Sequence, residues 1–294
     1  MTYQEMLHWG EEELKRQGIA EAKSNAWILF SYVFSMSRLE FMMHCIEDGE
    51  DAPENEEKWT VFQEMIEERV KGIPVQYITH EQNFYGYDFY VDDRVLIPRQ
   101  DTEVLVSCVE QAMQQEMLQK RKISPGRLLD MCTGSGCIAI TLANVLKWEE
   151  VWAVDVSEDA LAVAQRNNQT LGGMVHLLQS DLFSNLEGQK EYFDVIVSNP
   201  PYIESAVIDT LSVEVKDYEP RLALDGTADG LYFYRVIVKE AREYLKKEGQ
   251  LFFEIGAQQG AAVKQLCLDY GYEDVRIVAD LAGLDRVVAA RFKA

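Results

Sequence analysis

The chain has 294 residues, of which 47% are hydrophobic and 11% aromatic, enough for one large domain and a smaller one with well-formed cores. Its net charge of −22 repels phosphate backbones, so we expect no direct DNA binding and favour a basic protein or a cationic cofactor as partner. No stretch is long and apolar enough to span a membrane, and the five scattered cysteines follow no metal or disulfide spacing. We therefore expect a cytoplasmic monomer with no membrane association and no metal centre.

Residues 1–80 are expected to form a small helical domain. Apolar residues recur at helical spacing within 19–30 and again within 59–70. The acidic run 47–54 between these segments contains a glycine and a proline, and it predicts a loop. The apolar stripes are interpreted as the core of a helical bundle.

Residues 81–98 are expected to form a β-hairpin that joins this bundle to the rest of the chain. The aromatic run 84–91 and the apolar run 95–97 read as its two strands. Asp92-Asp93 between them is the expected turn, and Pro98 ends the second strand.

Residues 99–294 alternate between strand-like and helix-like segments, which predicts an α/β domain. Such alternation is typical of a doubly wound, mostly parallel sheet. Two strands near the end are expected to pair antiparallel. The expected strands are 127–131, 151–154, 175–178, 193–198, 250–255, 275–278 and 286–292, and the expected helices are 137–147, 157–168 and 231–247.

A glycine-rich turn, Asp130-Met131-Cys132-Thr133-Gly134-Ser135-Gly136, follows the first of these strands. Gly134 and Gly136 lack a Cβ atom, so the backbone turns tightly and a ligand approaches closely. Ala139 supplies the small residue that a dinucleotide fingerprint has after its second glycine, so a Rossmann dehydrogenase remains a rival. A P-loop is excluded, because no Gly-Lys-Ser/Thr follows.

Three aspartates lie at successive strand ends, and they favour a cationic cofactor. Asp155 is placed to accept hydrogen bonds from both hydroxyls of a ribose. Asp181 and Leu182 are placed to receive an adenine, the carboxylate taking the amine and the leucine covering the ring. Together with Asp130, these carboxylates suit the sulfonium and ammonium of S-adenosylmethionine better than the two phosphates of NAD. Each aspartate alone also fits a helix cap or a turn, and Asp181 has the weakest case.

Asn199-Pro200-Pro201-Tyr202 directly follows the apolar strand 193–198. Neither proline donates to a strand ladder, so the chain leaves the sheet in a stiff turn that presents Asn199 at the ligand-binding edge. Its side-chain oxygen and the Pro200 carbonyl are expected to accept the two N–H groups of a primary amide or amine. Tyr202 is expected to wall the site and face the cationic donor.

The glycine turn, Asp155 and this tetrapeptide together predict a class I methyltransferase, with its Rossmann-like fold, acting on a nitrogen. Methyl transfer from a sulfonium needs positioning and no prior base, and none of the four histidines is assigned a role. Protein glutamine and nucleic-acid adenine N6 are both open as the acceptor at this point. A nucleotide-binding module without catalysis is the third reading.

Several separate segments resemble the HemK/PrmC-type glutamine methyltransferases, and the resemblance runs over most of the chain. The match includes the glycine turn and the Asn-Pro-Pro-Tyr loop. The further matching segments are Gly72–Ile78, Phe84–Arg99, Asp101–Glu103, Glu219–Leu224, Asp229–Leu231, Glu254–Gly256 and Asp285-Arg286.

This resemblance implies methylation of class-1 peptide chain release factors, on the side-chain N5 of the glutamine in their Gly-Gly-Gln motif. S-adenosylmethionine would be the donor and S-adenosylhomocysteine the product, and the N-terminal helices would grip the release factor. The implied substrate-binding residues are Asn199, Pro200, Pro201, Tyr202 and Arg99, the first, second and fourth of them catalytic. The implied cofactor-binding residues are Asp130, Thr133, Gly134, Ser135, Gly136, Asp155, Asp181, Leu182 and Asn199.

The chain departs from the family pattern at two positions. Cys132 stands where a glycine is usual, and it fits the turn if its φ is negative, whereas a positive φ would introduce strain that weakens cofactor binding. Gln100 replaces the proline of a Pro-Arg-Pro segment and is expected to change only loop stiffness. The alternative of an adenine N6 methyltransferase needs a basic groove, for which the sequence offers no Lys/Arg cluster.

Overall fold

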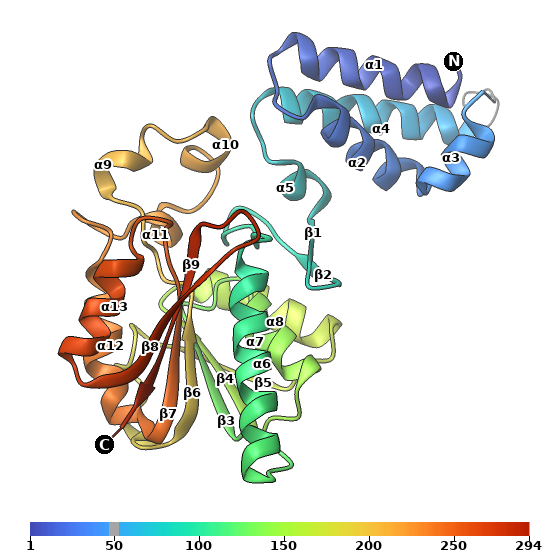
Figure 1. Cartoon of the computed structure of the whole chain (residues 1–294). Coiled ribbons are helices and arrows are strands. Elements are labelled where there is room, and N and C mark those ends of the chain that lie inside the picture. The colour runs from blue at the N-terminus through green and yellow to red at the C-terminus, as the bar shows by residue number, and fades with distance from the viewer. Residues whose placement is uncertain (47–52, 294) are drawn as a thin grey trace. The chain divides into compact units, whose positions relative to one another are not determined.

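The computed structural model describes residues 1–46 and 53–293, apart from the side chains of 53 and 54, and divides the chain into two compact units. The first unit comprises residues 1–80 and 213–218, and the second comprises 81–212 and 219–294. Figure 1 shows the elements of each unit. Within the described residues, no helix combines the length and apolarity needed to cross a membrane.

The first unit is built from helices, as the apolar spacing predicts. Thr2 and Ser37 cap the first and third helices, each in a capping box with a glutamate three residues later. Phe30 and Phe62 are fully buried in the shared core. The helices are α1 (Tyr3–Arg16), α2 (Ala22–Phe34), α3 (Arg38–His44), α4 (Pro53–Val70) and α5 (Val75–Thr79).

The loop predicted at 47–54 falls mostly outside the described residues. Its last two positions are helical, because α4 begins at Pro53. Proline is well suited to the first turn of a helix, where its missing N–H is not needed. The expected loop therefore extends too far at its C-terminal end.

A buried arginine holds a distant segment against the first unit. The Arg69 side chain is 2% exposed; its Nε donates to Asn25 Oδ1 at 2.6 Å, and its Nη2 pairs with Glu214. The Tyr218 hydroxyl donates to the Lys71 carbonyl at 2.9 Å. These contacts place α10 (Val213–Lys216) in this unit. The division into domains at 1–80, 81–98 and 99–294 stays a prediction.

The hairpin exists, but its strands are not those predicted. Strands β1 (Glu81–Phe84) and β2 (Tyr87–Tyr90) pair antiparallel. Their turn is Tyr85-Gly86, with φ of +52° and +83°, and two positive φ values are what a tight two-residue hairpin turn requires. The prediction of strands at 84–91 and 95–97 was wrong, because the turn lies inside the aromatic run. Asp92 instead binds the backbone and side chain of Arg94.

The second unit contains a seven-stranded sheet in the order β5-β4-β3-β6-β7-β9-β8. Neighbours from β5 to β7 pair parallel, and β9 pairs antiparallel with both β7 and β8. This confirms the predicted mostly parallel sheet with antiparallel C-terminal strands. The strands are β3 (Arg127–Met131), β4 (Glu150–Asp155), β5 (Val175–Gln179), β6 (Phe193–Ser198), β7 (Leu245–Glu254), β8 (Tyr272–Ala279) and β9 (Asp285–Phe292).

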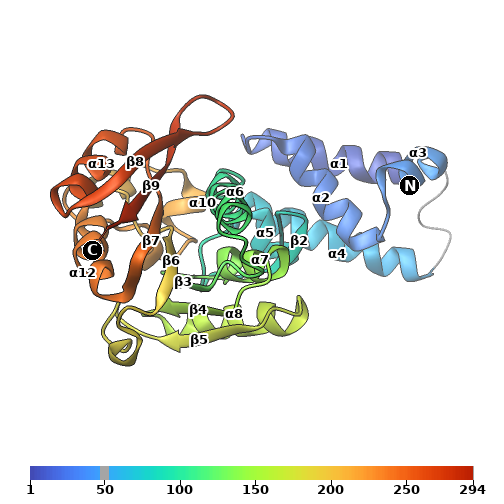
Figure 2. The ribbon, with the colours of Figure 1, turned by 60° about the horizontal axis from the view of Figure 1, so that its bottom comes forward.

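Helices cover both faces of this sheet, as a doubly wound fold requires. In Figures 1 and 2, α6 (Thr102–Lys120), α7 (Cys137–Val145) and α8 (Glu158–Thr170) lie on one face. The other face carries α12 (Tyr232–Tyr244) and α13 (Gly260–Asp269). A separate apolar core fills the space on each face. Short elements complete the unit: η1 (Glu187–Gln189), α9 (Ser205–Ile208) and α11 (Arg221–Leu224).

Candidate cofactor pocket and catalytic loop

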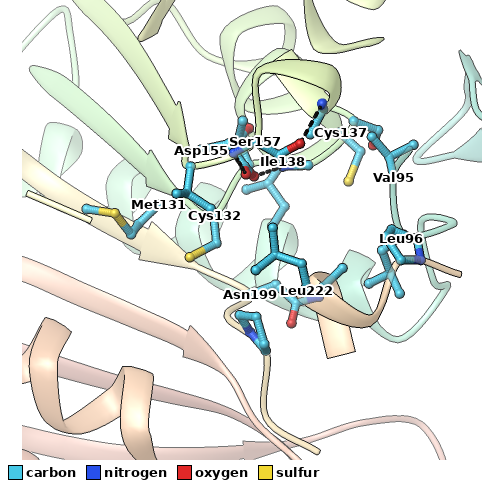
Figure 3. Close-up of a pocket in the computed structure, with 18 of the residues that line it drawn as sticks. Val95, Leu96, Met131, Cys132, Cys137, Ile138, Asp155, Ser157, Asn199 and Leu222 are labelled. Atoms are coloured by element: carbon cyan, nitrogen blue, oxygen red, sulfur yellow. Dashed lines mark hydrogen bonds between the residues drawn. The ribbon is translucent and has the colours of Figure 1, made fainter. Parts of the chain in front are cut away.

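A pocket lies where β3, β4, β5 and β6 end, at the carboxyl edge of the sheet. It is a partly open cavity lined by residues from the ends of these strands and from the segments around 94–102 and 220–223. Figure 3 shows Asp155 and Asn199 facing this cavity from two different strand ends. The predicted site residues that line it are Arg99, Thr133, Gly134, Ser135, Asp155, Asp181, Leu182, Asn199 and Pro201. Four others are not part of its lining: Asp130, Gly136, Pro200 and Tyr202.

Asp130 holds the glycine turn from inside the protein. Its side chain is fully buried, and Oδ2 accepts the Thr133 hydroxyl at 2.6 Å and the Ala139 amide at 3.2 Å. Oδ1 is buried without a hydrogen-bond partner. Burial raises the pKa of this carboxyl to about 7, against the opposing effect of the two hydrogen bonds.

The two glycines of the turn have positive φ values of +55° at Gly134 and +82° at Gly136. A Cβ atom at Gly134 would meet nothing within 4 Å, so this position leaves open space beside the pocket. A Cβ atom at Gly136 would lie 2.8 Å from Ile140 Cδ1. The first glycine therefore allows close approach of a ligand, and the second allows the turn to pack on α7.

Cys132 adopts a φ of +61°, the left-handed region that disfavours residues with a side chain. Of the two conformations considered from the sequence, Cys132 therefore adopts the positive φ that introduces backbone strain. The thiol lines the pocket, and burial raises its pKa far above the ordinary range. The thiol is therefore neutral and forms part of the pocket wall.

Asp155 ends β4, and each of its oxygens already accepts one backbone N–H. Oδ2 accepts from Gly134 at 2.9 Å, and Oδ1 accepts from Ser157 at 3.0 Å. A carboxylate has about four acceptor positions, so two remain for a ligand. Burial raises the pKa of this group, and the backbone hydrogen bonds oppose that rise.

Asp181 and Leu182 follow β5 at the far side of the pocket. Leu182 is 9% exposed and adopts a φ of +49°, and its carbonyl accepts the Ser180 hydroxyl at 2.6 Å. The Asp181 amide donates to Ser184 Oγ at 3.2 Å, while its side chain is exposed. The pair thus combines an apolar surface with a solvated carboxylate.

The Asn-Pro-Pro-Tyr loop begins where β6 ends and is held by neighbouring elements. The Asn199 amide nitrogen donates to Thr102 Oγ1 at 3.4 Å. The Tyr202 hydroxyl donates to Glu254 Oε1 at 3.4 Å, and its carbonyl accepts Gln259 Nε2 at 3.0 Å. Asn199 therefore lines the pocket, whereas Tyr202 anchors the loop to the end of β7.

Arg99 lines the pocket with its charge already compensated. Its Nη2 lies 2.7 Å and 2.6 Å from the two carboxylate oxygens of Glu219. The Glu219 side chain is 1% exposed, whereas that of Arg99 is 40% exposed. This pair fixes the start of the segment in which Leu222 and Ala223 also line the pocket.

Sequence reasoning missed several lining residues. Val95, Leu96 and Pro98, together with Pro220, Leu222 and Ala223, contribute to the apolar wall. Both segments lie within the family resemblance, which was the signal available for them. Thr102 also lies in a matching segment, Asp101–Glu103, but its contact with Asn199 joins residues 97 positions apart and could not be predicted from the sequence.

Two family models match the chain: the PrmC N-terminal domain over residues 5–79 and the methyltransferase small domain over residues 101–215. A release factor glutamine methyltransferase of Geobacter sulfurreducens is 39% identical over 290 residues, which cover 99% of this chain and 96% of that protein. The chain belongs to the family of release factor glutamine methyltransferases. A second member, from Clostridium botulinum, is 36% identical over 293 residues, 99% of each chain.

The solved structures agree with this family on the fold. A 16S rRNA N2-guanine methyltransferase of T. Thermophilus, in complex with AdoMet and guanosine, matches with a TM-score of 0.50 and 14% identity. The match covers 73% of this chain and 50% of that chain, and at such identity it establishes the fold alone. This release factor glutamine methyltransferase family member is thus an S-adenosylmethionine-dependent enzyme with a class I methyltransferase fold.

Proposed function

We propose that this enzyme methylates the side-chain N5 of the glutamine in the Gly-Gly-Gln motif of class-1 peptide chain release factors. The observation that carries the proposal is the placement of Asn199 on the same cavity as Asp155 and Gly134. A carboxamide-recognising side chain and a ribose-type acceptor thus share one pocket. The names of the relatives support the substrate class, and such a substrate belongs to the cytoplasm.

The residues of the pocket fit S-adenosylmethionine. Asp155 keeps acceptor positions for two ribose hydroxyls, and the open space at Gly134 admits a ligand close to the backbone. Leu182 offers an apolar surface for a purine ring. When bound there, this cofactor supplies a methyl group made electrophilic by a positively charged sulfur.

The loop residues act on the acceptor amide. A carboxamide nitrogen is a weak nucleophile, because its lone pair is delocalised into the carbonyl. Asn199 Oδ1 and the Pro200 carbonyl accept its two N–H groups, which favours a more electron-rich nitrogen and fixes its direction. Tyr202 contributes by anchoring the loop through Glu254, a supporting role in place of the pocket wall expected from sequence.

The first unit would grip the release factor outside the pocket. Docking at a second surface lowers the KM for an intact substrate without changing the chemical step. The enzyme should therefore show a much lower KM for intact release factor than for a short Gly-Gly-Gln peptide. Equal KM values for the two substrates would reject the docking role.

Incubation with methyl-labelled S-adenosylmethionine and a class-1 release factor, followed by mass mapping, tests the proposed reaction. The expected product carries one methyl group on the motif glutamine, and duplex DNA stays unlabelled. Asn199→Ala should abolish transfer while leaving S-adenosylhomocysteine binding largely intact. Asn144→Ala, at an exposed asparagine of α7, is the matched control. Label on DNA, or on another residue of the release factor, would reject the proposal.

A further inference from the structure

Gln259 lies in the turn that joins β7 to α13, and its side chain reaches the Asn-Pro-Pro-Tyr loop. Its backbone N–H donates to the Gly256 carbonyl at 2.8 Å, and its side-chain Oε1 accepts the Gly256 N–H at 2.9 Å. Its Nε2 donates to two further carbonyls, that of Tyr202 at 3.0 Å and that of Gly230 at 3.2 Å. One half-buried side chain therefore joins the end of β7, the catalytic loop and the segment before α12.

The orientation of the Gln259 amide follows from its partners. The Gly256 N–H can only donate, so it must face the amide oxygen. The Tyr202 and Gly230 carbonyls can only accept, so they must face the two N–H groups. An ionised glutamate lacks the donors and a lysine lacks the acceptor, so this position needs a side-chain amide.

Two glycines let the surrounding backbone approach Tyr202 closely. A Cβ atom at Gly226 would lie 2.7 Å from Tyr202 Cα, and a Cβ atom at Gly230 would clash with the Tyr202 carbonyl oxygen. The Gly226 N–H also donates to the Ile203 carbonyl at 2.8 Å. The chain that leaves the catalytic loop is thus packed against backbone and also held by Gln259.

The two prolines of the loop make an anchor after them necessary. Neither Pro200 nor Pro201 has an N–H, so no backbone donor fixes the loop at these positions. The loop starts from a fixed point, because the Ser198 hydroxyl donates to the Met131 carbonyl at 2.7 Å. Pro201 fixes its own φ and restricts the residue before it. The direction of the Pro200 carbonyl therefore depends on where the Tyr202 backbone is held.

We propose that Gln259 is a positioning residue for methyl transfer, because it holds Tyr202 and thereby aims the Pro200 carbonyl at a substrate N–H. The inference rests on the proposed function, which assigns that carbonyl to the acceptor amide. Gln259 does not line the pocket, so its effect passes through the loop. A misplacement of about 1 Å at a reacting group costs about 100-fold in rate.

Two substitutions at Gln259 test the inference in the full-length enzyme. Gln259→Met keeps the length of the side chain and removes the donors and the acceptor. Gln259→Glu keeps the acceptor for Gly256 but, when ionised, sets a carboxylate against two carbonyl oxygens. At about pH 8 we expect each variant to lower kcat for a Gly-Gly-Gln peptide about 10–100-fold. S-adenosylhomocysteine binding, measured by calorimetry, should stay largely intact, because Asp155 and the glycine turn are held by other contacts.

The pH profile of kcat separates positioning from a purely structural role. A protonated carboxyl in Gln259→Glu donates to the Tyr202 carbonyl and replaces the lost N–H. The kcat of this variant, as a ratio to wild type, should therefore recover as the pH falls from about 8 to about 6, because the facing carbonyls favour the neutral carboxyl and raise its pKa. The ratio for Gln259→Met should stay constant. The titratable and charged groups around this turn are present in every variant and cancel in the ratio: Tyr202, Tyr234, Glu254, Asp285 and Arg286.

Gln265→Met is the matched control, at an exposed glutamine of α13 whose amide donates to Asp269. It should leave kcat at the wild-type value at every pH. Wild-type kcat in either Gln259 variant, or a loss in Gln259→Glu that does not shrink at lower pH, would overturn the inference. If Gln259→Met fails to fold, as judged by circular dichroism, the pH profile of Gln259→Glu decides. A wild-type enzyme that leaves the peptide glutamine unmethylated would instead refute the proposed function.

Discussion

Replacing Asp130 by asparagine should change how the stability of the enzyme depends on pH. The pKa of this buried carboxyl is raised from 3.8 to about 7 in the folded protein. The folded state therefore holds its proton more tightly than the unfolded state. Its stabilising effect is complete below pH 3.8 and is lost as the pH rises through about 7.

The magnitude follows from the size of the shift. A difference of about three pH units corresponds to about 4 kcal/mol between the two protonation states. Asp130→Asn cannot ionise, so its free energy of unfolding should rise relative to wild type by about that amount between pH 4 and pH 8. The new amide nitrogen at the place of Oδ1 lacks a partner and costs about 1–3 kcal/mol at every pH. The pH dependence of the difference is thus the quantity to measure.

Urea denaturation at several pH values, without cofactor, gives this difference directly. Glu254 titrates in both proteins and cancels in the comparison. Asp159→Asn, at an exposed position of α8, is the control and should show a nearly constant difference. A difference between Asp130→Asn and wild type that does not change with pH would refute the reasoning.

Three further predictions concern the cofactor turn and the first unit. Asp155→Ala should weaken S-adenosylhomocysteine binding by about 1.5–3 kcal/mol, or about 10–150-fold in Kd by calorimetry, and an unchanged Kd would reject the ribose role. Cys132→Gly should relieve about 1–2 kcal/mol of left-handed strain against about 0.5–1 kcal/mol for glycine flexibility. Its net gain in stability, with tighter cofactor binding, is measurable by thermal denaturation, and a loss of both would show that the turn is unstrained. Arg69→Ala should destabilise the first unit by about 2–3 kcal/mol, because Asn25 loses its buried partner, whereas Arg16→Ala, at an exposed ion pair, should change little.

The second unit was predictable wherever the pattern is local. The apolar run 193–198 matches β6 residue for residue, and the glycine turn and its helix follow from backbone chemistry. The start of β7 was not predicted, because Lys246 and Lys247 read as the basic last turn of a helix. The structure ends that helix at Tyr244 and pairs Leu245 with Phe193 instead.

The missing part of the site depends on contacts between distant segments. Asn199 and Asp155 could be predicted from the sequence, because Asp155 ends a strand and Asn199 directly follows one at the ligand-binding edge. Thr102 and Glu254 lie in segments that resemble the family, but the contacts of Thr102 with Asn199 and of Glu254 with Tyr202 exist only in the folded chain. The strands of the hairpin were predicted wrongly for a local reason. Tyr85 adopts a positive φ in the turn, and nothing about a tyrosine in the sequence indicates that conformation.

A crystal structure of the enzyme with S-adenosylhomocysteine tests the central claim most directly. The account predicts that the ribose hydroxyls bind Asp155 and that the sulfur faces Asn199 at the end of β6. A ligand bound away from the Asn-Pro-Pro-Tyr loop would contradict it, because no methyl group could then reach an amide held by Asn199.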